Sequence, residues 1–159
     1  SRHMIQALLG EYRLVVEDLE RHVKGVNEQE LVKVVDRKTK DPNCVSIQSI
    51  LTHVVDCGRN YLRMIDVHRG NADSPKPRRV QLSNATKYRV ALDAMMADTE
   101  AYFENVEESE MVRYDPRKKM QASWGQIFDI EQLLEHAIVH VSRHRRQVQR
   151  FKKLLRGEA

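Results

Sequence analysis

Two histidines four residues apart, His140 and His144, lie in a segment whose other core-facing positions are apolar. On a helix, side chains at this spacing lie on one face with their Cβ atoms ~6 Å apart, so both imidazoles can converge on one ion. Burying an imidazole among apolar side chains is costly without a partner, so His144 requires a hydrogen bond or a metal ion. The predicted seam comprises Ile130, Leu134, Ala137, Val141, His144, Val148, Phe151 and Leu155.

A pair of this kind has more than one interpretation. In zinc proteases with the same spacing, a glutamate next to the first histidine supplies the general base. Val141 occupies that position here, which excludes the protease mechanism. Two interpretations stay open: a metal site, or two structural histidines, one in the core and one at its edge.

A third ligand must come from a neighbouring helix. We expect His22 and His68 to lie near helix ends and His136 to face solvent, away from the seam. His53 lies one turn inside another predicted helix, on the flank of its apolar stripe, and this placement suits a crevice between helices. Cys57 follows it by four residues on the same face, as either a thiolate ligand or a small core residue.

Three imidazoles on one face of an ion leave coordination positions open, which is typical of catalytic sites. A bound ion lowers the pKa of a water or thiol and presents it as a nucleophile at neutral pH. The sequence therefore suggests a metal-dependent transferase or hydrolase, with thiolate attack on a small electrophile as the concrete hypothesis. No carboxylate stands out as a general base, so we assign no catalytic residue beyond the metal-bound group. Nitrogen ligands favour zinc first and nickel next, with iron or manganese as further candidates.

Four helical segments are needed to position these residues. Hydrophobic periodicity predicts helices over about 4–24, 46–69, 84–106 and 129–155, with Ser46 and Asp129 as N-caps. One helical turn is expected in the connector after the first helix, and a brief extended segment at 112–114. Without convincing strand pairs, the prediction is an all-α four-helix bundle. About a dozen residues link helices two and three, which is enough to run back along a helix and allow these two to be parallel.

The bulk composition fits one soluble domain. The chain has 159 residues with 6 glycines and 4 prolines, so long helices are favoured over many short strands. We interpret residues 1–3 as a cloning remnant and residues 4–159 as a single domain. No apolar run is long enough to span a bilayer and no secretory signal precedes the first helix. Two cysteines form no disulfide framework, and the expectation is a cytoplasmic protein.

Charge and apolar patterning suggest possible partners. The formal charge of +4 is concentrated near the C-terminus, at Arg143, Arg145, Arg146, Arg150, Lys152, Lys153 and Arg156. We expect a solvated helix end and consider nucleic-acid binding less favoured. The alternative function is nevertheless a non-catalytic helical protein that binds nucleic acid or an acidic partner through this helix. The first helix has an apolar stripe wider than one seam needs, which predicts a homodimer. That stripe includes Leu8, Leu9, Val15, Val16 and Val23.

The stretch SWGQIFDIEQLLEHAIVHVSRHRRQ resembles the DinB-like (DinB/YfiT) family of metal-binding four-helix bundles. In that family a Trp-Gly step leads into the last helix, which carries a histidine, then a histidine–arginine pair, then a glutamine. Another histidine follows a serine N-cap and an I..IL run in helix two. Arg146 replaces the usual glycine, but it points away from the seam. The matching residues are Trp124, Gly125, His140, His144, Arg145 and Gln147, with Ser46, Ile47, Ile50, Leu51 and His53.

The resemblance covers most of the chain and carries specific implications. It implies an up-down-down-up bundle with a long crossover between helices two and three. It also implies a divalent metal ion held by His53, His140 and His144. Some relatives are thiol transferases that use bacillithiol or isomerases that use mycothiol, and many have no known activity. The resemblance thus adds a low-molecular-weight thiol as a candidate cosubstrate and a small molecule as the expected substrate.

Overall fold

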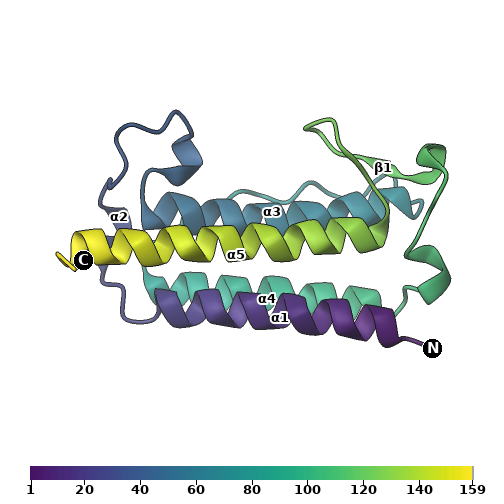
Figure 1. Ribbon diagram of the computed structural model, residues 1–159, viewed down its shortest axis with the longest axis horizontal. Helices are drawn as coiled ribbons and strands as arrows, with labels where there is room; N and C mark the ends of the chain where they lie inside the picture. The colour runs from purple at the N-terminus through teal and green to yellow at the C-terminus, as the bar shows by residue number, and fades with distance from the viewer. Residues whose placement is uncertain (159) are drawn as a thin grey trace.

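The computed structural model describes residues 1–158, most of which are helical. Four long helices lie along the length of the molecule (Figure 1): α1 (His3–Val23), α3 (Ile47–His68), α4 (Ala85–Phe103) and α5 (Ile130–Leu155). The shorter α2 (Glu28–Val32) supplies the helical turn expected in the first connector. The all-α class predicted from hydrophobic periodicity is therefore confirmed. Among residues 1–158, no helix has both the length and the apolar character needed to cross a membrane.

The helices begin where capping chemistry predicts. The side chains of Ser46, Asn84 and Asp129 each accept a hydrogen bond from a backbone N–H in the first turn of α3, α4 and α5. These bonds satisfy donors that have no partner inside the helix. Ser46 and Asp129 also form reciprocal capping boxes with Ser49 and Gln132. Helices α3 and α5, which carry the three candidate histidines, therefore have well-defined starting points.

Hydrogen bonds between helix ends show that α3 and α4 run in the same direction. At their N-terminal ends, the Gln48 side chain donates to the Leu82 carbonyl at 2.9 Å. At their C-terminal ends, Arg69 donates to the Asn105 carbonyl at 2.8 Å. The connection at 69–84 therefore returns along the molecule, as the sequence allowed but did not decide (Figure 1). The Ser74 carbonyl of this connection accepts a hydrogen bond from Arg63 on α3.

The other pair, α1 and α5, also run in the same direction. Lys152 near the end of α5 donates to the His22 carbonyl near the end of α1 at 2.7 Å. One to two turns earlier, the Arg145 guanidinium lies 3.1 Å from the Asp18 carboxylate. Arg2, just before α1, donates to the carbonyl of Val106, just beyond α4, at 2.8 Å. Helix α1 therefore runs antiparallel to α4 and packs between α4 and α5.

The apolar stripe of α1 is largely used within the chain. Val16 and Val23 are fully buried, while Leu8, Leu9 and Val15 are partly buried against the core. Much of the surface that suggested a homodimer thus contacts α4 and α5 of the same chain. Leu14 is the large apolar side chain of α1 that remains most exposed, at 58%.

A small hairpin departs from the sequence-based expectation. Strands β1 (Met120–Gln121) and β2 (Ile127–Phe128) pair antiparallel, with Met120 opposite Phe128. The segment 112–114, where extended structure was expected, forms no strand. Each strand has only two residues, too few for an alternating pattern to be visible in the sequence. Gly125 permits the turn because its φ is 97°, a conformation that disfavours other residues.

Candidate metal centre

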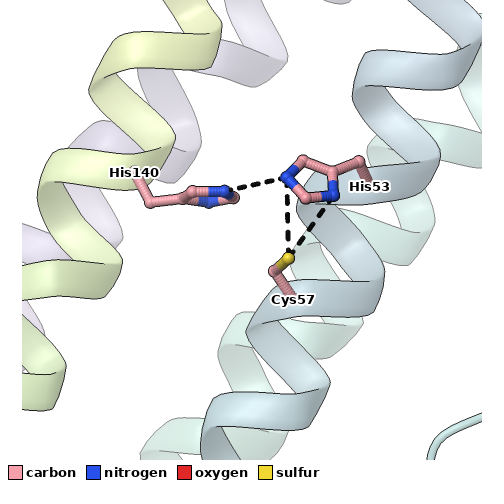
Figure 2. Close-up of side chains that lie close together, drawn as sticks. All are labelled: His53, Cys57 and His140. Atoms are coloured by element: carbon pink, nitrogen blue, oxygen red, sulfur yellow. Dashed lines mark hydrogen bonds between the residues drawn. The ribbon is translucent and has the colours of Figure 1, made fainter. Parts of the chain in front are cut away.

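The structure brings together the three histidines singled out from the sequence. His53 projects from α3, whereas His140 and His144 project from α5 toward it. The Nε2 atom of His140 lies 3.1 Å from Nε2 of His53 and 3.1 Å from Nε2 of His144. Figure 2 shows the His53 and His140 rings meeting between the two helices. The Nε2 atom of His140 therefore has a ring nitrogen of another histidine on each of two sides.

Burial keeps these rings neutral. His144 is only 4% exposed and continues the seam between Val141 and Val148, as expected. Desolvation makes the largest contribution to the lowered pKa of His53, His140 and His144. The pKa of His140 is lowered to about 3. A buried imidazole resists protonation because the cation would lose its hydration. At neutral pH the three rings therefore retain the lone pairs that metal binding requires.

A glutamine fixes the tautomer of the most buried ring. Gln147 Oε1 lies 2.6 Å from Nδ1 of His144, one turn earlier on α5. An amide oxygen only accepts hydrogen bonds, so Nδ1 of His144 must carry the proton. In the neutral ring, Nε2 is then unprotonated and directs its lone pair toward His140. Such outer partners orient ligating histidines in metal sites. The glutamine that accompanies the histidines in the sequence therefore has a defined contact.

The nitrogen spacing is compatible with a single ion. Ligand nitrogens ~2.1 Å from zinc and roughly 90–110° apart are separated by ~3.0–3.4 Å. The observed distances of 3.1 Å between neighbouring Nε2 atoms lie within that interval. Hydrogen bonding alone does not account for the cluster, because His144 Nε2 has no proton and His140 Nε2 can donate to only one neighbour. The residues present therefore fit a divalent ion.

Cys57 adds a sulfur atom to this group. Its Sγ lies 3.5 Å from Nδ1 and 3.7 Å from Nε2 of His53 (Figure 2). The donor atoms of His53, Cys57 and His140 all lie within 4.8 Å of one another. Burial raises the pKa of the Cys57 thiol to about 11. Without an ion, this cysteine is therefore a thiol at neutral pH.

A cleft of about 790 Å³ opens beside the cluster, and His53, Cys57 and His140 form part of its wall. Helices α3 and α5 form two of its sides, and the hairpin contributes Gln121 and Gln126. Further lining residues are Asn60, Tyr61, Arg63, Met64, Ser123, Trp124 and His136. The donor atoms are thus located where a small molecule can reach them. His144 is buried and does not line this cleft.

Aromatic rings form one wall of the cleft. The Trp124 ring stacks on His136 with centroids 5.2 Å apart, and Tyr61 meets His136 edge-on at 5.5 Å. The expectation that His136 faces solvent is wrong, because the hairpin folds over α5 and leaves this ring half-buried. His136 also stacks on His140 at 6.2 Å between centroids. The Trp-Gly step before α5 was noted in the sequence, but neither the hairpin nor its position over His136 was predicted from it.

The remaining histidines considered as ligands lie elsewhere. His22 lies near the end of α1, with its Nε2 4.0 Å from the Asp18 carboxylate. His68 is the last residue of α3, fifteen positions beyond His53. The group of mutually close donors among the described residues is His53, Cys57 and His140, and it includes neither of them. His144 adjoins this group through its 3.1 Å contact with His140.

Comparison with known protein families identifies the family of this chain. The DinB family matches residues 35–155, which include α3, α4 and α5 and all the donor atoms described above. The chain belongs to the DinB family. The match begins after α1 and α2, so α3 and α5, which carry the candidate histidines, lie in the part shared with the family. No curated protein matches the chain at a significant level.

Proposed function

We propose that this DinB-family protein is a divalent-metal-dependent enzyme whose ion is held by His53, His140 and His144. The observation that carries the proposal is the convergence of their Nε2 atoms, 3.1 Å apart in successive pairs, beside a cleft of about 790 Å³. A protein site that offers three nitrogens and an accessible side is typical of catalytic centres. Zinc is the proposed ion, nickel the next candidate, and iron or manganese are further candidates.

The supporting fold is inferred to be one four-helix-bundle domain in up-down-down-up order. Parallel α3 and α4, parallel α1 and α5, and the returning connection at 69–84 support this order. Helices α3 and α5, which carry the proposed ligands, pack against each other and form two sides of the cleft. The proposed cytoplasmic location rests on the presence of two free cysteines. A homodimer stays a proposal, with exposed Leu14 as the residual apolar contact on α1.

A bound ion would lower the pKa of a thiol or water and supply it as a nucleophile at neutral pH. The protein's own residues provide the surroundings for that chemistry. Gln147 holds the Nδ1 proton of His144, and burial keeps the imidazoles neutral. Trp124 and Tyr61 cover one side of the cleft and reduce the access of water. The favoured reaction is S-transfer from a low-molecular-weight thiol to a small electrophile.

The composition of the cleft supports a small, uncharged or anionic substrate. In the described part of the chain, Arg63 is the single lining residue with a formal charge at neutral pH. The rings of Trp124, Tyr61 and His136 offer surfaces to which planar groups can stack. The side chains of Asn60, Gln121 and Gln126 add neutral hydrogen-bonding groups. A planar electrophile with a neutral or anionic substituent matches this lining.

The alternative function, binding of nucleic acid through the basic end of α5, receives less support. Three of the cations that suggested it are engaged within the chain: Arg145 with Asp18, Lys152 with the His22 carbonyl and Arg156 with Glu30. Phosphate contacts would have to compete with these interactions. A steep loss of DNA affinity with salt would favour this alternative.

The test begins with untagged protein, because a polyhistidine tag would itself bind metal. Elemental analysis should find about one divalent ion per chain, and His53→Gln should reduce that content strongly. The metal-loaded protein is then assayed with bacillithiol, mycothiol and glutathione against a panel of aromatic electrophiles. Protein that binds no divalent ion at micromolar concentrations would refute the proposal. Binding without turnover would refute its catalytic part.

A further inference from the structure

Cys57 lies on the cleft side of the three histidines. It follows His53 by one helical turn on α3, and Figure 2 shows its sulfur below the His53 ring, on the same helix. The residue is half-buried and lines the cleft, so it is not simply a small residue filling the core. His144 does not line the cleft. Cys57 is therefore placed on the side where the three nitrogens leave an ion accessible.

The sulfur distances are close to those within a mixed nitrogen–sulfur site. Zinc bonds of ~2.1 Å to nitrogen and ~2.3 Å to sulfur, at tetrahedral angles, separate these two donors by ~3.6 Å. Cys57 Sγ lies 3.7 Å from Nε2 of His53. The relevant atoms of Cys57 and His140 are no more than 4.8 Å apart.

Tyr61 accompanies the thiol on the wall of the cleft. It follows Cys57 by four residues, so the two side chains lie on one face of α3. The contacts of Cys57 Sγ within hydrogen-bonding distance are both to His53. The surroundings of the sulfur therefore point to the histidine cluster.

We propose that Cys57 is a fourth protein ligand for thiophilic divalent ions. This inference rests on the proposed three-histidine centre. On binding, the Cys57 thiol releases its proton to the solvent and its sulfur forms a bond to the ion, without change of oxidation state. Zinc, cobalt and cadmium would then have three nitrogens and one sulfur, whereas manganese, which prefers oxygen ligands, would have the nitrogens alone. Cys57 would thereby distinguish soft from hard ions and compete with an external thiol for the same side of the ion.

Cobalt(II) provides a direct test, because its visible bands report binding and a near-ultraviolet charge-transfer band reports a sulfur ligand. Untagged metal-free protein is titrated with Co²⁺ under reducing conditions, alongside Cys57→Ser and the matched control Cys44→Ser. The unmutated protein and Cys44→Ser should show both signals, and Cys57→Ser should keep the visible bands but lose the charge-transfer band. Visible bands without a charge-transfer band in the unmutated protein would refute the role of Cys57 and leave the histidine centre standing. Charge transfer that persists in Cys57→Ser would also refute that role. Failure to bind Co²⁺ at all would overturn both proposals.

Affinity measurements provide a second readout. Cys57→Ser should weaken Cd²⁺ binding by at least about tenfold, because a thiolate ligand is lost. Mn²⁺ affinity should stay within about twofold of the unmutated value. Competition with a chromophoric chelator measures both constants on the same samples. If Cys57→Ser lost the same affinity for Cd²⁺ and Mn²⁺, that result would contradict a ligand that prefers soft ions.

Discussion

Gln147 Oε1 lies 2.6 Å from Nδ1 of His144, and this contact determines which nitrogen of the buried histidine is free. The amide oxygen holds the proton on Nδ1, so the unprotonated Nε2 faces Nε2 of His140 at 3.1 Å. The other tautomer would instead present an N–H to an ion, and a flipped ring would present a carbon. The glutamine is therefore a positioning residue for the proposed metal centre.

Loss of this contact should weaken metal binding without unfolding the protein. Gln147→Leu should lower zinc affinity by about 10- to 100-fold, the usual cost of removing an outer partner of a histidine ligand. Gln147→Glu retains an acceptor oxygen at the same place and should restore most of the affinity. Competition titrations with a chromophoric chelator measure these changes. Gln149→Leu, which removes the acceptor for Arg145 on the same helix, serves as the control. Equal affinities of Gln147→Leu and Gln147→Glu would contradict a role for the acceptor.

Substitutions of His144 should separate metal binding from packing. A chelator should lower the melting temperature of the metal-loaded protein at neutral pH, since an ion that binds only the folded chain stabilises it. His144→Ala and His144→Leu should both abolish the chelator effect. In the absence of metal, the free energy of unfolding of His144→Leu should exceed that of His144→Ala by about 2 kcal/mol or more, because leucine fills the buried position. Urea denaturation of the metal-free proteins measures this difference. An unmutated protein that melts identically with and without chelator, although loaded, would refute the coupling.

The metal-free protein should lose stability in mild acid. Histidines of the unfolded chain titrate near ~6.5, whereas burial lowers the pKa of His140 to about 3 in the folded state. Between these values the unfolded chain binds protons that the fold excludes, so the free energy of unfolding falls as pH falls below ~6.5. Above ~7.5 this group contributes no pH dependence. At pH 5 the loss from His140 should be at most about 2 kcal/mol.

Urea denaturation of the metal-free protein at pH 8, 6 and 5 measures that pH dependence. His140→Leu should lower the slope between pH 6 and 5, because the leucine binds no proton in either state. Arg146→Gln, at an exposed position on α5 beyond His144, is a control that keeps all three imidazoles. A slope that is unchanged in His140→Leu would show that other groups cause the acid sensitivity.

Trp124 should report metal binding by fluorescence, because it is the single tryptophan of the chain. It stacks on His136, which in turn stacks on His140. Open-shell ions such as Ni²⁺ quench excited tryptophan at short range, so one equivalent should reduce the emission, whereas Zn²⁺ should quench it much less. His53→Gln should abolish quenching at that concentration and leave the aromatic wall in place. Quenching that needs many equivalents, or survives in His53→Gln, would place the ion elsewhere.

The residues of the candidate site that lie on helices were predicted from the sequence better than those that lie on the hairpin. His144 broke an apolar seam with a period of 3.6, and that irregularity is visible in one segment of sequence. The start of α5 at Asp129 was likewise encoded locally, by a capping residue before an amphipathic run. Both signals depend on neighbours within a few turns. The structure therefore confirms these elements, whereas the metal-binding role stays a prediction.

The cleft could not be predicted in the same way. Its wall depends on the hairpin folding back over α3 and α5, which brings Trp124 to Tyr61 across more than sixty positions of sequence. Strands of two residues leave no periodic signal, and His136 on a helical wheel points away from the α5 seam. The half-buried state of His136 therefore arises from a long-range contact that local pattern does not contain.

The donor atoms come from α3 and α5 alone, and this placement has a consequence for how the fold opens. His53 and His140 are 87 positions apart, so a bound ion would act as a reversible cross-link between distant parts of the chain. It would raise the free energy of every fluctuation that separates these two helices. Fraying at the N-terminal end of α1, which provides no donor, would require the same free energy with and without the ion. Amide hydrogen exchange would then slow most along α3 and α5 upon metal loading, and the protein would become more uneven in local stability as its overall stability increased.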